Sequence, residues 1–247
     1  MKRKLKIGII TILLITVAVV LSFNMSISHI IKSAIETNGA KVLGTDVKLD
    51  KVNVSMFTGA VTLDNVTIVN LPGYQLPNFL TMHKANAEVS TGTLLNKKKK
   101  IRIKNIELAG INLTVEQKGS ETNLQKIIEA VSKYKFSDRN LWIDELKITD
   151  VTITIALPGI SGKDNAITFK LQPVTIRNIG KDEDLDTAMV LNKILAVITD
   201  KITQKGADII PKDLLDTLSS ALNNSLLKLS NDIIKSLKDL FTPGSDK

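Results

Sequence analysis

The strongest constraint on the fold of this chain is an eight-residue pattern, Φ-x-Φ-x-x-Φ-x-Φ, in which Φ is apolar and x is mostly polar. Copies of it occupy residues 47–54, 61–68, 101–108, 141–148 and 169–176. Two copies continue the alternation, so that residues 101–115 align with residues 141–155 at a spacing of 40. Apolar side chains at a period of two lie on one face of a β-strand. The repeat therefore predicts a β-sheet with one aliphatic face.

The two adjacent polar positions inside each copy interrupt this alternation once. A β-bulge would absorb the interruption within one strand and keep both halves of the apolar set on the same face. A tight turn at Asp64-Asn65 or Lys104-Asn105 would instead divide the copy into two short strands. We favour the bulge, because the halves are short for hairpins. The expected sheet is curved and antiparallel, with bulged strands and one polar face.

The aliphatic face allows two interpretations, and the residues alone leave both open. It is either a core closed by helices or the wall of a groove for acyl chains. On the second interpretation the candidate lipid-facing residues are Val52, Val54, Val61, Leu63, Val66, Ile68, Ile101, Ile103, Ile106, Leu108 and Leu113.

The first 25 residues predict a transmembrane anchor. Residues 7–23 carry no charge and no proline, and these 17 residues would span about 26 Å as a helix, close to the hydrocarbon thickness of a bilayer. The basic residues before this segment place the N-terminus in the cytoplasm and the body on the other side. The apolar run is long for a secretory signal and no small-residue cleavage site follows it, so we expect the anchor to be retained. Residues 26–40 are expected to continue as a linking helix that ends at Gly39.

Beyond residue 180 the apolar spacing lengthens to about 3.6 residues, which predicts helices. One stripe comprises Leu185, Ala188, Leu191, Leu195, Ile198 and Ile202. A second helix is expected to start at Pro211 and to carry Leu215, Leu218, Leu222, Leu226, Leu229, Ile233, Leu237 and Leu240. These helices either pack on the sheet or hold a membrane or partner, and the mixed charges on their polar side favour packing.

Shorter signals complete the organisation of the chain. A helix is predicted from Asn123 to Lys133 with Thr122 as its N-cap, and loops are predicted at residues 71–77 and 158–165. The fold class is α+β. Its parts are a transmembrane signal anchor (1–25), a linking helix (26–40), a β-rich domain (41–180) and a helical C-terminal region (181–247).

Residue types that carry catalysis, metal binding or nucleic-acid binding are scarce. There is no cysteine, the two histidines have no metal-ligand spacing, and no catalytic motif occurs. The net charge is +8, but only four of the 33 basic residues are arginine and aromatic content is 4%, which disfavours nucleic-acid recognition. We therefore expect that the protein is not an enzyme and that it binds no cofactor, metal or nucleic acid. The lysine run at residues 97–100 is interpreted as a solvated turn that also protects a sheet edge, in preference to the alternative of a lipid-contact patch.

The anchor and the segments that follow it resemble the AsmA-like family of bacterial envelope proteins. The similar segments are residues 42–49, 59–70, Pro72-Gly-Tyr74, residues 87–95 and 101–116, Gly119 and Thr122-Asn123-Leu124, so that the resemblance covers residues 1–131. It implies an inner-membrane anchor, a periplasmic β-rich body, and a role in envelope integrity, outer membrane biogenesis or lipid transport.

Long members of this family look like extended grooves that carry phospholipid between membranes. About nine strands would give only about 40 Å of sheet in this chain, which is short for a bridge across an envelope. The expected function is therefore the shielding or handling of membrane lipid on the aliphatic face by a short, single-anchor member. The alternative is a non-catalytic scaffold or chaperone-like protein that contacts other envelope proteins through its C-terminal helices.

Overall fold

The computed structural model describes residues 26–96, 98–134, 139–157 and 166–227. The expected anchor, the loop at residues 158–165 and the end of the second C-terminal helix lie outside the described residues. Among the helices of the described ranges, none is both long and apolar enough to cross a membrane.

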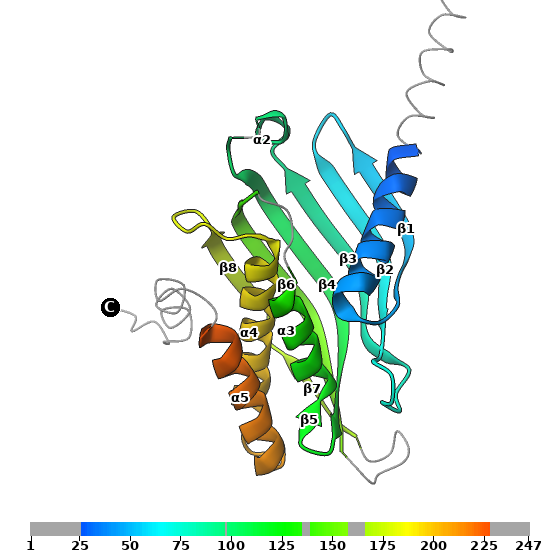
Figure 1. Ribbon diagram of the computed structural model, residues 1–247, viewed down its shortest axis with the longest axis vertical. Helices are drawn as coiled ribbons and strands as arrows, with labels where there is room; N and C mark the ends of the chain where they lie inside the picture. The colour runs from blue at the N-terminus through cyan, green and yellow to red at the C-terminus, as the bar shows by residue number, and fades with distance from the viewer. Residues whose placement is uncertain (1–25, 97, 135–138, 158–165, 228–247) are drawn as a thin grey trace, which may run out of the picture.

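The fold is α+β, with one eight-stranded sheet and helices on one of its faces (Figure 1). The strands are β1 (Val47–Ser55), β2 (Ala60–Val69), β3 (Asn78–Val89), β4 (Ile101–Lys118), β5 (Glu121–Thr122), β6 (Leu141–Ala156), β7 (Ile167–Leu171) and β8 (Val174–Ile179). The helices are one over residues 26–43, then α2 (Thr91–Leu95), α3 (Asn123–Lys133), α4 (Thr187–Gly206) and α5 (Lys212–Leu227).

The sheet is mixed, and the expectation of a purely antiparallel sheet is wrong at one pair of strands. The order is β1-β2-β3-β4-β6-β7, with β5 beside β4 and β8 beside β6. β4 and β6 run parallel, because α3 lies between them in the chain and returns it to the end of the sheet at which β4 began. Their register pairs Ile106 with Leu146 and Leu113 with Ile153, which is the 40-residue spacing of the sequence repeat.

Positions without a paired partner line up across the sheet at one level, which falls inside the repeat copies of β1 and β2 and just after those of β4 and β6. Five neighbouring strands each have a residue at this level that falls outside the paired register; together these residues form the bend line: Asp50, Asn65, His83, Gly110 and Asp150. β4 and β6 have a second unpaired position, at Lys104 and Asp144. Both strands of every pair contain the interruption at the same level, so the register continues unchanged beyond it, as from Lys51–Asp64 to Leu49–Val66. β2 and β4 are therefore continuous strands, and the alternative of two short strands joined by a tight turn is wrong for them.

The last copy of the repeat behaves differently from the others. It is divided into β7 and β8 at Gln172 and Pro173, and both pieces pair with β6. A proline has no backbone N–H to donate to a ladder, which explains the break at this position.

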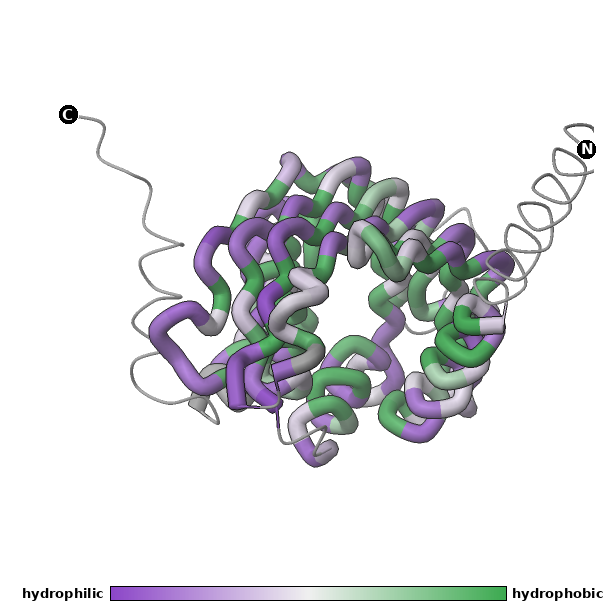
Figure 2. The backbone as a smooth tube through the Cα atoms, turned by 90° about the horizontal axis from the view of Figure 1, so that it is seen from above, coloured by the Kyte–Doolittle hydropathy of each residue, from purple (hydrophilic) through white to green (hydrophobic). Residues whose placement is uncertain are grey.

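The helices form two separate layers on the concave side of the curved sheet (Figure 2). The helix over residues 26–43 packs through Ile31 and Ile35 on a small core of Val47, Leu49, Val52 and Val66. The larger core joins β4, β6 and β8 to α3, α4 and α5; its fully buried members include Leu124, Ile148, Ile153, Ile202 and Leu214.

Several helix expectations require correction. The first helix continues to residue 43 and ends before Gly44, whose φ of 70° suits a helix C-terminus, and not at Gly39. Leu191 is 37% exposed on α4, and the buried side of α5 is Leu214, Leu218 and Ala221. The expected stripe is confirmed at Leu218, but packing of α5 against α3 and α4 turns the buried side toward Leu214 and Ala221. The prediction for α3 is confirmed, including the N-cap, where Thr122 Oγ1 accepts from the Gln125 amide at 3.1 Å.

Candidate functional site

Aliphatic side chains form continuous rows across the strands of the sheet, on the face that carries the helices. In one row the cross-strand neighbours are Val54, Val61, Ala87, Ile106, Leu146 and Ile176. In the next they are Val52, Leu63, Ala85, Leu108, Ile148 and Val174. The one-sided apolar face predicted by the repeat is therefore present.

The ends and the middle of these rows differ in burial. At the β6 and β8 end, Leu146 and Ile176 are covered by the C-terminal helical layer. At the β1 end, Val52 is covered by the helix over residues 26–43. Between the two layers the side chains of these rows on β2, β3 and β4 are only half-buried, except Ala85, which is buried. We call this region the open strip; it consists of Val61, Leu63, Ala87, Ile103, Ile106 and Leu108.

The open strip follows from the order of elements in the chain. One helix precedes β1 and covers β1 and β2, while α3, α4 and α5 follow β4 and cover the other half. The connections between β1, β2, β3 and β4 supply only α2, which has five residues and lies at the end of the sheet (Figure 1). In the described part of the chain, no helix is therefore left to cover the middle strands.

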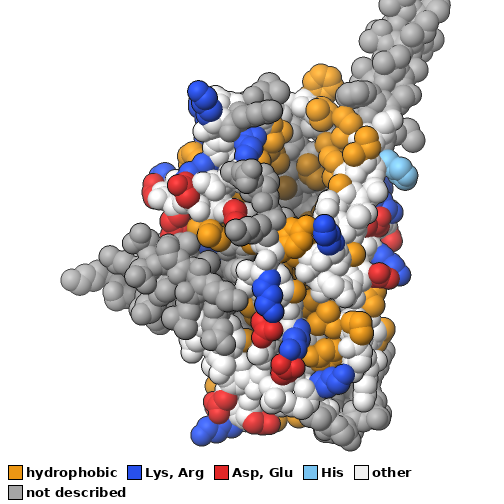
Figure 3. Space-filling view, in the orientation of Figure 1, with side chains coloured by type: hydrophobic (Ala, Val, Ile, Leu, Met, Phe, Trp, Pro, Cys, Tyr) orange, Lys and Arg blue, Asp and Glu red, His pale blue; other side chains and the backbone are white. Residues whose placement is uncertain are grey.

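The strip lies in the half of the sheet nearest to α2. Toward the other end, the rows contain the buried residues Leu49, Val66, Ile111 and Leu113. Figure 3 shows hydrophobic side chains in a recess in the upper part of the face, beside the helix over residues 26–43.

The predicted lipid-facing residues all lie in the sheet, and they divide by burial. Val52, Val66 and Leu113 are buried in the two cores, at 5%, 7% and 3% exposure. The others are half-buried: Val54, Val61, Leu63, Ile68, Ile101, Ile103, Ile106 and Leu108. Ile68 packs against both cores, so we do not include it in the open strip.

β3, which lies at the centre of the strip, carries a copy of the repeat that was not recognised from the sequence. β3 carries the same alternation at Leu80, Met82, Ala85, Ala87 and Val89, with His83 and Lys84 at the double polar position. Its alanines are weakly apolar, which hid the copy, although the spacing of its Leu, Met and Val was a usable signal. Of these two alanines, Ala85 is buried and Ala87 is half-buried.

The opposite face of the same strands is polar. The row Thr62, Asn86, Glu107 and Lys147 lies beside the apolar rows, and Thr62 Oγ1 donates to Asn86 Oδ1 at 3.0 Å. Arg102 forms an ion pair with Asp144 at 2.8 Å and lies 4.3 Å from the centre of the Trp142 ring. The sheet thus separates an aliphatic surface from a hydrated one.

Groups with perturbed acidity lie away from the strip. Burial raises the pKa of Tyr74 and that of Asp200, and the hydrogen bond to Glu121 raises the pKa of Lys126. Within the described ranges, no group of three or more His, Cys, Asp or Glu side chains could hold a metal ion. The side chains of the open strip itself are all aliphatic.

A second hollow lies at the far end of the sheet and is more polar. Its volume is about 420 Å³, and it is lined by Leu43, Leu71, Pro72, Tyr74, Lys118, Glu121, Lys126 and Ala130. The buried carboxylate of Glu116 holds the adjoining loop, because it accepts from the backbone amides of Gln75 at 2.6 Å and Leu76 at 3.0 Å. These contacts give Glu116 a structural role.

The lysine run at residues 97–100 differs from the expected solvated, edge-protecting turn. Lys98 and Lys99 are exposed, but Lys100 Nζ donates to the carbonyl oxygens of Gly180 at 3.1 Å and Glu183 at 2.7 Å. The run precedes β4, which is an inner strand, so the interpretation that it protects a sheet edge is wrong.

Comparisons of the chain with family models, curated proteins and solved structures find no match. The AsmA-like resemblance therefore remains a prediction from the sequence.

Proposed function

We propose that this protein is a single-pass inner-membrane protein whose periplasmic body handles lipid in envelope biogenesis, and that the open strip binds an acyl chain. One observation carries the proposal: helices bury Val52 on β1 and Leu146 and Ile176 on β6 and β8, whereas the residues of the open strip between them are only half-buried. A surface of this kind normally serves as a binding site, because contiguous exposed apolar area is disfavoured in water.

The dimensions of the strip suit an extended hydrocarbon chain. Ile103 and Leu108 are five residues apart along β4, which corresponds to roughly 17 Å, and β2 to β4 spans roughly 10 Å. Each methylene group removed from water contributes about 0.8 kcal/mol. A lipid held this way would leave its headgroup outside the strip, so the strip needs no charged partner for it.

Photochemical cross-linking tests where an acyl chain binds. The full-length protein, extracted in a mild detergent, would be incubated with a fatty acid that carries a diazirine on its chain. Peptide mapping should find adducts at Leu63, Ile106 or Leu108, and should not find them at Thr62 or Glu107, their neighbours on the polar face. Adducts spread equally over both faces, or none at all, would contradict the proposal.

The scaffold alternative has one observation of its own. Leu191 on α4 and Ile209 in the turn before α5 are 37% and 46% exposed on the C-terminal helical region. If the region holds other envelope proteins, Leu191→Lys and Ile209→Lys should reduce their co-purification and leave acyl labelling unchanged. No loss of a co-purified protein in either variant would remove this alternative.

A further inference from the structure

One end of the body exposes several large hydrophobic side chains. Met56 and Phe57, at the tip of the β1–β2 hairpin, are 52% and 83% exposed, and Leu94 on α2 is 46% exposed. The hairpin tip and α2 lie together at the upper end in Figure 1, where the helix over residues 26–43 also begins. Ile30, in the first turns of that helix, is 67% exposed. The apolar exposure is thus concentrated at the end where the chain enters the body.

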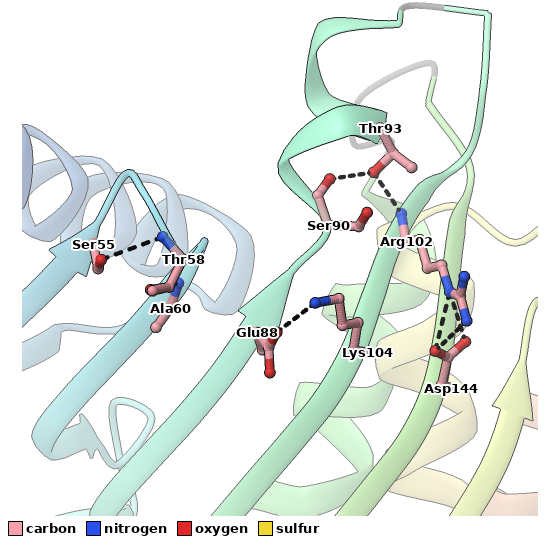
Figure 4. Close-up of polar contacts among 9 residues, drawn as sticks. All are labelled: Ser55, Thr58, Ala60, Glu88, Ser90, Thr93, Arg102, Lys104 and Asp144. Carbon is pink, nitrogen blue, oxygen red and sulfur yellow. Dashed lines mark hydrogen bonds and ion pairs between the residues drawn. The ribbon is translucent and has the colours of Figure 1, made fainter.

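Hydrogen bonds hold these segments in place, as Figure 4 shows. In the hairpin tip, the Thr58 amide donates to Ser55 Oγ at 3.4 Å and the Ala60 amide donates to Thr58 Oγ1 at 3.3 Å. In α2, Thr93 Oγ1 donates to the Ser90 carbonyl at 2.7 Å and accepts from the Arg102 amide at 3.1 Å. Phe57 and Leu94 therefore lie in turns whose conformation is stabilised by hydrogen bonds.

The two turns are also joined to each other. The Val89 amide, at the end of β3, donates to the Gly59 carbonyl at 2.9 Å. A side chain on Gly59 would lie 2.0 Å from the Val89 carbonyl oxygen, so only glycine permits this close approach. The hairpin tip and the segment that leads into α2 are thereby held together at this end of the body.

The same surface carries positive charge. Arg139 donates to the carbonyl oxygens of Thr93 at 2.7 Å, Asn96 at 3.0 Å and Lys99 at 2.7 Å, which fixes the turn after α2. Lys98 and Lys99 in this turn are exposed, and neither forms an ion pair with a described residue. The turn holds two lysines beside the exposed Leu94.

We propose that this end of the body, defined by Met56, Phe57, Leu94, Lys98 and Lys99, rests on the surface of the bilayer. Apolar side chains next to lysines bind the headgroup region, where the former enter the acyl boundary and the latter attract anionic lipid. The occupant is a bilayer because the uncharged run of residues 7–23 ends three residues before residue 26, where the described helix begins at this end.

This inference rests on the anchor of the proposed function and adds a second contact with the membrane. It also implies how the open strip is oriented relative to the membrane. The strip lies in the half of the sheet nearest to α2, so its accessible end would face the lipid surface from which an acyl chain would come.

Site-specific fluorescence tests the docking. The chain has no cysteine, so single substitutions can carry an environment-sensitive dye: Phe57→Cys and Leu94→Cys at the proposed surface, and Ile209→Cys as an exposed apolar control at the opposite end. Thr16→Cys reports insertion of the anchor. The full chain would be reconstituted into vesicles of phosphatidylcholine and phosphatidylglycerol that contain doxyl-labelled lipid.

Quenching at positions 57 and 94 should exceed quenching at position 209 several-fold. Replacing both Lys98 and Lys99 by Gln should reduce it in vesicles with phosphatidylglycerol and leave it unchanged in neutral vesicles. Strong quenching at position 16 with no difference between 57, 94 and 209 would overturn the docking and leave the anchor intact. Absence of quenching at position 16 as well would overturn the anchor, and the docking with it.

Discussion

At the scale of single residues, the bend line explains how the repeat folds. Asn65, Gly110 and Asp150 have φ values of 51°, 70° and 52°, in a left-handed region that Gly, Asn and Asp tolerate better than other residues. On the polar face, Asn65 Nδ2 donates to Asp50 Oδ2 at 2.8 Å, and Asn65 Oδ1 lies 3.1 Å from His83 Nδ1. At these three positions of the bend line, residue type therefore suits the backbone conformation as well as exposure.

Asn65 provides a test of this explanation. Asn65→Val places a β-branched residue at a positive φ, which should lower the free energy of unfolding by about 2 kcal/mol. Asn65→Gly keeps the conformation and loses only exposed hydrogen bonds, so it should cost about 1 kcal/mol or less. Thermal unfolding followed by circular dichroism compares the two, and equal losses would show that the left-handed conformation is unimportant.

Gly110 adds a steric requirement to the conformational one. A Cβ at this position would lie 2.8 Å from the Cβ of His83, whereas a Cβ on Gly119, which also has a positive φ, would have no neighbour within 4 Å. Gly119→Ala should cost about 1 kcal/mol of unfolding free energy and Gly110→Ala should cost clearly more. If denaturation midpoints fall equally in the two variants, the close packing across the bend line is incorrect.

At the scale of elements, the repeat predicts the strands well and their directions poorly. Alternation with a period of two is the same for parallel and antiparallel partners, so residues 101–115 and 141–155 could be recognised as copies but not as parallel neighbours. The direction of β6 depends on the crossover through α3. Similarly, adjacent leucines at positions 214 and 215 allow two helical stripes, and only packing against α3 and α4 selects the one with Leu214.

The sequence alone also could not predict which residues of the aliphatic face are buried. Val52 and Ile106 occupy equivalent positions in two copies of the repeat, yet Val52 is buried and Ile106 is half-buried. The difference comes from the helices, which cover β1 and not the middle of β4. The candidate residues were found because they share a face, whereas their division into core and open strip required the tertiary arrangement.

Arg139 is the residue on which the order of α2 is expected to depend. Arg139→Ala removes the guanidinium hydrogen bonds to the turn after α2, and should increase hydrogen exchange of amides between residues 91 and 100 about tenfold or more. Arg177→Ala is the control, because Arg177 pairs with Glu145 on the exposed face at 2.8 Å. Exchange in residues 91–100 that is the same in both variants would contradict this role.

At the scale of the whole molecule, two helical layers lie on the same face of one curved sheet. They cover the two lateral parts of that face and leave its middle partly open. The first layer continues from the expected anchor, and the open half of the sheet lies at the same end of the molecule (Figures 1 and 3). This places a lipid-sized apolar surface near the proposed bilayer contact. The central claim is that an acyl chain occupies this surface.

Native mass spectrometry of the detergent-extracted, full-length protein tests that claim most directly, with two variants that differ by one position. Ala87 lies on the open strip between Val61 and Ile106, and Asn86 lies on the polar face between Thr62 and Glu107. We expect wild-type protein and Asn86→Trp to retain bound lipid, and Ala87→Trp to lose most of it, because the indole would fill the strip. Equal lipid occupancy in the two variants, or no bound lipid in the wild-type protein, would contradict the account.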